Sequence, residues 1–167
     1  MGLLDFVRSA GEKLFHTGPA KTAMAEAVAE PASEEKVKAA NDAAADAITA
    51  YIAAQSLTAT GLLVTFDGAS ATATVYGVAP DQATQEKIVL CCGNVSGVAA
   101  VNNMMSVDHS EPEATYYTVV AGDNLSKISR ASYGDPNKYM KIFEANKPML
   151  THPDKIYPGQ VLRIPPA

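Results

Sequence analysis

Apolar residues in the middle of the chain recur first at helical and then at strand spacing. Between residues 37 and 52 they fall on one helical face, and Ser33 precedes the run as a candidate N-cap. Gly61 marks the expected end of this helix. Apolar and polar residues then alternate over 62–66 and again over 71–75, with an Asp-Gly turn signal between the two runs. The pattern predicts a helix followed by a β-hairpin.

A second helix and a third strand follow the hairpin. Pro80 suits the first turn of a helix that runs through 88–90 and stops at Gly93. A glycine-flanked turn over 93–97 leads into a strand over 101–107, in which alternate residues share one face. The predicted order of this region is helix, strand, strand, helix, strand.

The last third of the chain has a different order. It begins Tyr-Tyr-Thr-Val-Val-Ala-Gly-Asp-Asn-Leu from Tyr116 and closes Ile-Tyr-Pro-Gly-Gln-Val-Leu-Arg-Ile-Pro from Ile156. These two short strand runs flank two helical runs, and Asp123 or Asn124 can cap the first helix. The expected fold class is α+β, with two small domains of αββαβ and βααβ order.

The domain boundaries follow from composition. Residues 1–32 are read as an N-terminal segment with an Ala-rich tether, 33–108 as the first domain, 109–115 as a linker and 116–166 as the second domain.

Charge and targeting patterns exclude several classes. Thirteen Lys and Arg face eighteen Asp and Glu, a net charge of −5, which disfavours binding driven by nucleic-acid phosphates. No apolar run is long enough to span a membrane, and the first residues lack the pattern of a signal peptide or a myristoylation site. Cys91 and Cys92 are adjacent, so they form no disulfide framework. We therefore expect a cytoplasmic protein without membrane or nucleic-acid partners.

The sequence resembles two domain families and one protein family, and these resemblances narrow the range of expected functions. The C-terminal third resembles a LysM domain, and the stretch Gly93-Asn94-Val95-Ser96-Gly97, followed by Val101 and Asn103, resembles the end of a BON domain. Together with the opening Met-Gly-Leu-Leu-Asp-Phe-Val-Arg and the run Ile-Phe-Glu-Ala-Asn-Lys-Pro from Ile142, the chain is similar to the Kbp family of bacterial potassium-binding proteins. This resemblance implies a soluble sensor or buffer that binds K⁺, with Rb⁺ and Cs⁺ as weaker substitutes. It also implies that ion binding changes how the two domains sit against each other.

The family resemblance also implies which residues hold the ion. Its ligands would be backbone carbonyls of two sets, Val7, Ala10 and Glu12, and Gly93, Val95 and Gly97. The residue types are compatible with this, because carbonyl dipoles suit K⁺ and no Asp-rich calcium loop is present. Glycines that end helices remain the alternative for Gly11 and Gly93.

Other functions remain open at this stage. A LysM domain usually binds N-acetylglucosamine polymers. In this chain the resemblance implies a groove formed by Gly122, Asp123, Asn124, Leu125, Ile156 and Tyr157. A scaffold that binds other proteins is a third alternative. No Ser-His-Asp set, phosphate-binding loop or dinucleotide motif occurs, and the three histidines stand apart, so an enzyme is not expected.

Overall fold

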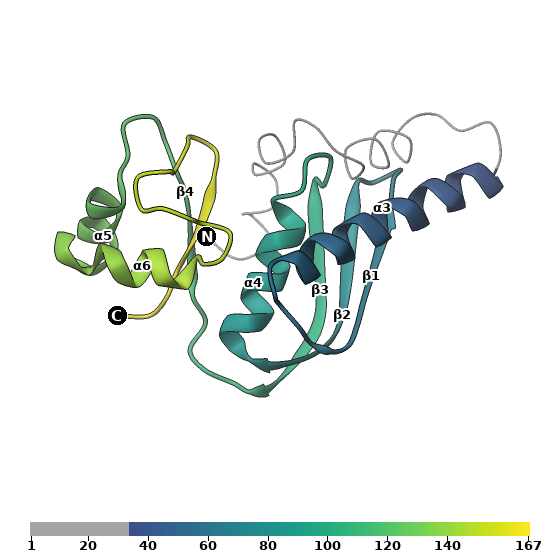
Figure 1. The fold of residues 1–167 in the computed structure, drawn as a ribbon, viewed down its shortest axis with the longest axis horizontal. Coiled ribbons are helices and arrows are strands. Elements are labelled where there is room, and N and C mark those ends of the chain that lie inside the picture. Colours follow the sequence, from purple (N-terminus) through teal and green to yellow (C-terminus); the bar gives the residue numbers. More distant parts are fainter. Residues whose placement is uncertain (1–33) are drawn as a thin grey trace.

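The computed structural model describes residues 34–167 (Figure 1). Its first unit is a three-stranded sheet with two helices on one side (Figure 1). The order is α3 (Glu34–Ala54), β1 (Thr60–Asp67), β2 (Thr72–Asp81), α4 (Gln82–Gly93) and β3 (Ala100–His109). β2 pairs antiparallel with β1 and parallel with β3, which requires α4 as the crossover between them.

The core of this unit lies between the sheet and its helices. α3 contributes Ala44, Ile48 and Ile52, which are completely buried, and α4 contributes the buried pair Ile88 and Val89. Alternate strand residues complete the core, namely Val64, Phe66, Ala73, Val75, Ala79, Val101 and Met105. Met105 is 9% exposed and Met104 is 57% exposed, so the two neighbouring methionines point to opposite faces of β3.

Two expected element boundaries were wrong. Pro80 lies in β2, and α4 begins two residues later because the side chain of Asp81 caps it, accepting from the Thr84 N–H at 2.7 Å. Gly61 does not end the first helix, which stops at Ala54. It lies inside β1 with φ 63°, where the pairing with β2 shifts register.

The second unit is a two-stranded sheet covered by short helices. Its elements are β4 (Thr115–Thr118), α5 (Leu125–Tyr133), the 3₁₀ helix η1 (Pro136–Lys138), α6 (Tyr139–Ala145) and β5 (Val161–Ile164). Asn124 is the N-cap of α5, accepting from the Lys127 N–H at 2.9 Å. The fold is thus α+β, and the βααβ order of the C-terminal third is confirmed.

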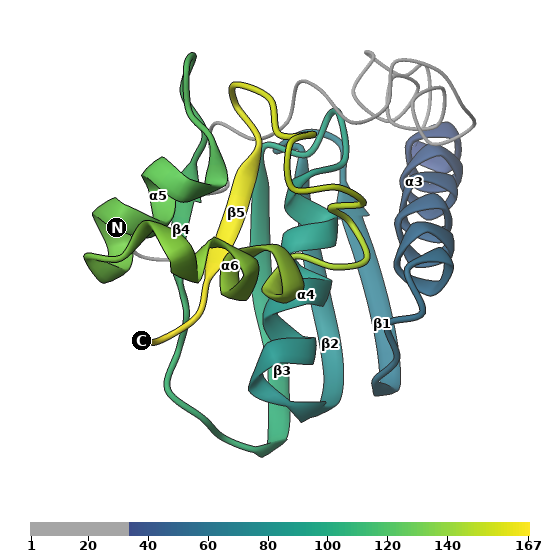
Figure 2. The ribbon, with the colours of Figure 1, turned by 60° about the vertical axis from the view of Figure 1, so that its left-hand side comes forward.

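The second unit is docked against α4 of the first unit. Figure 2 shows β5 beside α4. Val161 of β5 belongs to the core of the first unit, and Met149 and Tyr116 pack against that core. The Met149 sulfur lies 3.4 Å from the Cys91 sulfur in the last turn of α4. The two units therefore share apolar contacts along this helix.

Candidate ion site and the docked second unit

The turn at the end of α4 is tightly folded and largely buried. Asn94, 3% exposed, donates its backbone N–H to the Leu90 carbonyl at 3.1 Å, and so ends the helix. Val95, 1% exposed, donates to the Cys92 carbonyl at 3.2 Å. Gly97 has φ 94°, a backbone conformation that residues with side chains rarely adopt. The chain can reverse here only because Gly97 permits that angle.

This turn presents carbonyl oxygens at the negative end of a helix. The carbonyl of Val95 accepts from the Val98 N–H at 3.1 Å, which leaves its second lone pair for another partner. Within residues 34–167, no backbone hydrogen bond goes to the carbonyl of Gly93 or Gly97. The last turn of α4 carries no basic side chain, and the helix dipole favours a cation at this end. Gly93 both ends α4 and begins the turn, so its helix-ending role and a role as ligand are compatible.

The structure brings together only half of the expected ion ligands. Gly93, Val95 and Gly97 lie in one turn, whereas Val7, Ala10 and Glu12 fall outside the described residues. In the part of the chain that the structure describes, no group of three or more His, Cys, Asp or Glu residues is placed to hold a metal. Backbone carbonyls of the turn are therefore among the oxygens that a cation could use there.

A cavity of about 490 Å³ lies on the second unit beside the start of α5. Asn124, Leu125 and Ser126 line one side, and Tyr139 and the loop 152–154 line the other. Asn124 and Leu125 were expected in a glycan groove, but Gly122, Asp123, Ile156 and Tyr157 are not among the lining residues. Asp123 instead accepts from the Tyr117 hydroxyl and the Val120 N–H, each at 2.9 Å. Sequence reasoning missed Tyr139 and His152, because nothing in their spacing relates them to Asn124.

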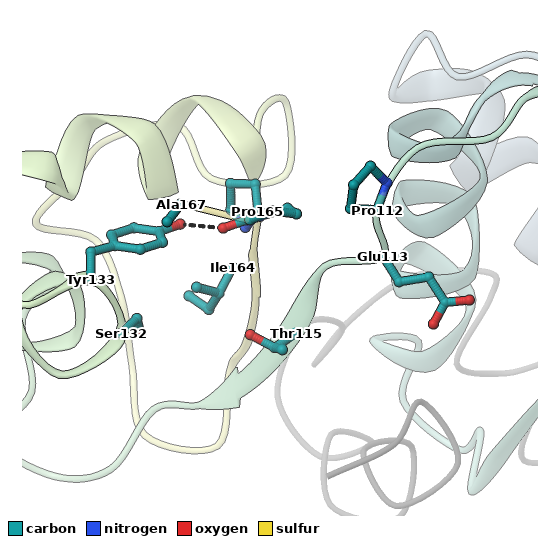
Figure 3. Close-up of a pocket in the computed structure, with 9 residues that line it drawn as sticks. Pro112, Glu113, Thr115, Ser132, Tyr133, Ile164, Pro165 and Ala167 are labelled. Carbon is teal, nitrogen blue, oxygen red and sulfur yellow. Dashed lines mark hydrogen bonds between the residues drawn. The ribbon is translucent and has the colours of Figure 1, made fainter.

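A second cavity, of about 420 Å³, lies where the linker meets the C-terminus (Figure 3). Pro112 and Glu113 lie across it from Tyr133, whose hydroxyl donates to the Pro165 carbonyl at 2.7 Å. The remaining lining is Thr115, Ser132, Ile164, Pro165, Pro166 and Ala167. These residues offer neither a nucleophile–base pair nor a metal-ligand set.

A buried ion pair joins the two units. Arg163 Nε of β5 donates to Glu86 Oε2 of α4 at 2.6 Å, and both side chains are only 6–7% exposed. The other carboxylate oxygen, Oε1, accepts from Gln82 Nε2 and from the Ala114 N–H, each at 3.0 Å. The carboxylate thus accepts hydrogen bonds from α4, from β5 and from the linker. A buried charge is stable only when it is paired and hydrogen-bonded in this way.

The backbone of this arginine is itself held in place by Asn146, the residue that directly follows α6. The Arg163 N–H donates to Asn146 Oδ1 at 2.7 Å, and Asn146 Nδ2 donates back to the Arg163 carbonyl at 2.8 Å. Asn146 is 1% exposed. Sequence reasoning missed this cluster. Its one signal was a charged residue in the otherwise apolar run Val-Leu-Arg-Ile.

The cysteines are buried thiols. Both are 0% exposed, and burial raises the pKa of Cys91 to about 12 and raises that of Cys92 as well. The neutral thiol is a weak nucleophile, so neither cysteine is suited to catalysis. In the described residues, no helix is both long and apolar enough to cross a bilayer.

Comparison with known proteins agrees with this architecture. The family model of the BON domain matches residues 40–109, and that of the LysM domain matches residues 117–165. The chain is therefore a two-unit protein in which a BON domain precedes a LysM domain. "Potassium binding protein Kbp" from Escherichia coli O6:H1 is 43% identical over 168 residues, which cover 99% of both chains. The chain belongs to the Kbp family.

A second relative matches a shorter stretch. An uncharacterized protein from Deinococcus radiodurans is 53% identical over 51 residues, which cover 30% of this chain and 19% of that protein.

Proposed function

We propose that this protein binds K⁺ and acts as a sensor or buffer of that ion, without catalysing a reaction. The observation that carries the proposal is the 43% identity over 99% of the chain to a protein named for potassium binding. Both domain types are binding modules. The cavities and the buried polar cluster of the described residues supply no catalytic set.

The proposed ion site is the turn at the end of α4, completed by the N-terminal segment. Carbonyls of Gly93, Val95 and Gly97 would supply three oxygens, and those of Val7, Ala10 and Glu12 the other three. Six carbonyl dipoles can replace the hydration shell of K⁺, and they bind smaller ions less well where the cage does not contract around them. Rb⁺ and Cs⁺ would then substitute partly.

Ion binding at the turn 93–97 would affect both units. The turn follows the C-terminal end of α4, and the second unit packs along the side of the same helix. A change in how the two units contact each other is therefore part of the proposal. A cytoplasmic location agrees with it, since K⁺ is abundant there.

Thermal melting tests the proposal directly. The full-length protein is unfolded in KCl, RbCl, NaCl or LiCl at one ionic strength, and the midpoints are compared. A site that binds only the folded protein contributes about 2.7 kcal/mol when K⁺ is at a hundred times its dissociation constant. The midpoint should rise in KCl and, less strongly, in RbCl. Equal midpoints in all four salts would rule the proposal out.

A second candidate function rests on the cavity beside α5. Its volume of about 490 Å³ and the half-buried Tyr139 in its lining suit a short oligomer of N-acetylglucosamine, the usual ligand class of the matched LysM domain. Titration with N-acetylglucosamine oligomers, read by calorimetry, tests it. Tyr139→Ala should lose the heat signal, and Tyr76→Ala, which alters the first unit, should retain it.

A further inference from the structure

The loop of residues 146–160 connects α6 to β5 and extends between the two candidate binding sites of the molecule. Near its start, the Met149 sulfur lies 3.4 Å from the Cys91 sulfur in the last turn of α4 (Figure 2). Cys91 is two residues before Gly93, where the turn proposed to bind K⁺ begins. Farther along the loop, residues 152–154 line the cavity beside α5. One short segment therefore links the end of α4 to this cavity.

The start of the loop is packed into the cores of both units. Met149 packs against the core of the first unit, whereas the next residue, Leu150, is 2% exposed and belongs to the core of the second unit. The Leu150 N–H donates to the Asn146 carbonyl at 2.8 Å, which closes a tight turn around Met149. A movement of the last turn of α4 relative to the second unit must therefore shift or break the contact at Met149.

The far end of the loop also lies against the first unit. Burial raises the pKa of the Tyr51 hydroxyl in α3, and the nearby Cys91 and Tyr157 groups raise it further. Tyr157 of the loop is therefore close to both helices of the first unit. Val161, the first residue of β5, belongs to the core of that unit. Both ends of the loop are thus fixed by contacts with the first unit.

The middle of the loop, by contrast, has few contacts. His152, Asp154 and Lys155 are exposed. In the described chain, the backbone hydrogen bonds of this segment are local: the Asp154 N–H donates to His152 Nδ1 at 3.2 Å, and the Lys155 N–H donates to the His152 carbonyl at 3.0 Å. The position of residues 152–154 beside the cavity therefore depends mainly on the two fixed ends of the loop.

We propose that K⁺ bound at the turn 93–97 controls the shape of the cavity beside α5 through the 146–160 loop. This inference rests on the proposed potassium site. An ion that fixes the turn also fixes the last turn of α4, and with it the contact at Met149 and the position of residues 152–154. K⁺ thereby favours the arrangement in which these residues line the cavity opposite Asn124. A cavity ligand and K⁺ then raise each other's affinity by the same factor, because coupling between two sites is reciprocal.

NMR of the full-length protein tests this coupling without any cavity ligand. The side-chain resonances of His152 and Tyr139 are followed while NaCl is replaced by KCl at constant ionic strength and pH. They should shift with the midpoint that calorimetry gives for K⁺ binding. Met149→Ala removes the contact with Cys91 and should abolish these shifts, although K⁺ still binds. Met149→Leu keeps an apolar side chain there and should retain them.

Met104→Ala is the matched control for the truncation. Met104 is 57% exposed on the outer face of β3, so its loss should leave the K⁺-dependent shifts of His152 and Tyr139 unchanged. Thermal melting of the three variants establishes that they are folded. If the protein binds K⁺ while both resonances stay in place, the inference is wrong. Shifts that Met149→Ala leaves intact would also overturn it, because another contact would then transmit the change.

Calorimetry with the N-acetylglucosamine tetramer measures the size of the coupling. The tetramer should bind about fivefold or more tightly in KCl than in NaCl, and Met149→Ala should bring this ratio close to one. Equal affinities in the two salts would contradict the inference. If the wild-type protein does not bind K⁺, the proposed function fails and this inference fails with it. If the tetramer binds in neither salt, the second candidate function alone fails, since the shifts of His152 and Tyr139 decide the coupling.

Discussion

Two polar sites lie on α4, one in its first half and one at its C-terminal end, and they differ in whether side chains or backbone groups form them. In its first half, the Glu86 carboxylate binds Arg163 of the docked second unit and the Ala114 N–H of the linker. At its C-terminal end, the turn 93–97 offers backbone oxygens, and the residues there are Gly, Asn, Val, Ser and Gly. One site consists of ionised side chains, and the other site, proposed here for K⁺, would consist of carbonyls.

This difference decides how each site responds to substitution. A side-chain site is lost when one charged partner is removed, since the other charge remains buried without its partner. A carbonyl site survives the loss of most side chains, because every residue carries the same oxygen. It depends on backbone angles, and at Gly97 the angle of 94° is the vulnerable feature.

The largest effect is expected at the ion pair. Glu86→Ala leaves the guanidinium of Arg163 buried without the carboxylate, the Ala114 N–H loses this acceptor, and Gln82 loses one of its two acceptors. We expect a loss of about 3–5 kcal/mol in the free energy of unfolding, measured by urea denaturation. Lys38→Ala removes a partner of the exposed Lys38–Asp42 pair and should cost less than about 0.5 kcal/mol.

The double variant Glu86→Leu with Arg163→Met sharpens this prediction. It removes both charges, so it should be more stable than either single variant, although the Ala114 N–H still lacks an acceptor. If the single variants cost no more than Lys38→Ala, the ion pair contributes little and the comparison between the two ends of α4 fails.

The next largest effect concerns the N-terminal segment. Deleting residues 2–12 removes three of the six proposed ligands and should abolish the K⁺-dependent part of stability, about 2.7 kcal/mol at a hundred times the dissociation constant. Melting in KCl and NaCl should then give one midpoint. The LysM unit should stay folded, as monitored by the resonances of its Tyr133 and Tyr139 rings. Unchanged K⁺ affinity in the truncated protein would remove the N-terminal half of the proposed site.

Gly97→Val tests the backbone at the other end of α4. A β-branched residue at φ 94° costs about 1–3 kcal/mol, and the turn would relax away from the geometry that holds the ion. We expect lower stability together with a large loss of K⁺ affinity. Gly122→Val is the matched control. Its φ is 88° and there is open space around it, so it should show comparable strain with unchanged K⁺ affinity. Equal K⁺ affinity in both variants would argue against the turn as part of the site.

The smallest effect is expected for Glu12→Gln. The backbone oxygen remains, and only a nearby negative charge is lost, so K⁺ affinity should change by a few-fold at most when titrated calorimetrically. A complete loss of binding would instead indicate coordination by the side-chain carboxylate, and the contrast between a side-chain site and a carbonyl site would then disappear.

Much of the local structure could be predicted from the chain itself. Periodicity is sufficient where one face of an element is buried, as with Val64 and Phe66 in β1 or Ile142 and Phe143 in α6. The same periodicity, with glycine-flanked turns, indicated the α+β class and the order of both units. It failed at Pro80 and Gly61, because a proline ends a strand as readily as it begins a helix, and a glycine with positive φ occurs in a bulge as well as at a helix end.

Only the tertiary structure decided which distant residues meet. Glu86 and Arg163 are 77 residues apart and belong to different units, so no local pattern relates them. Leu63, Tyr76 and Met104 form one row because of the strand register, which is a property of the assembled sheet. Tyr139 reaches the cavity beside Asn124 through the packing of α6 against α5. Sequence determines which face of each element is apolar, whereas the contacts between elements depend on how those faces pack in three dimensions.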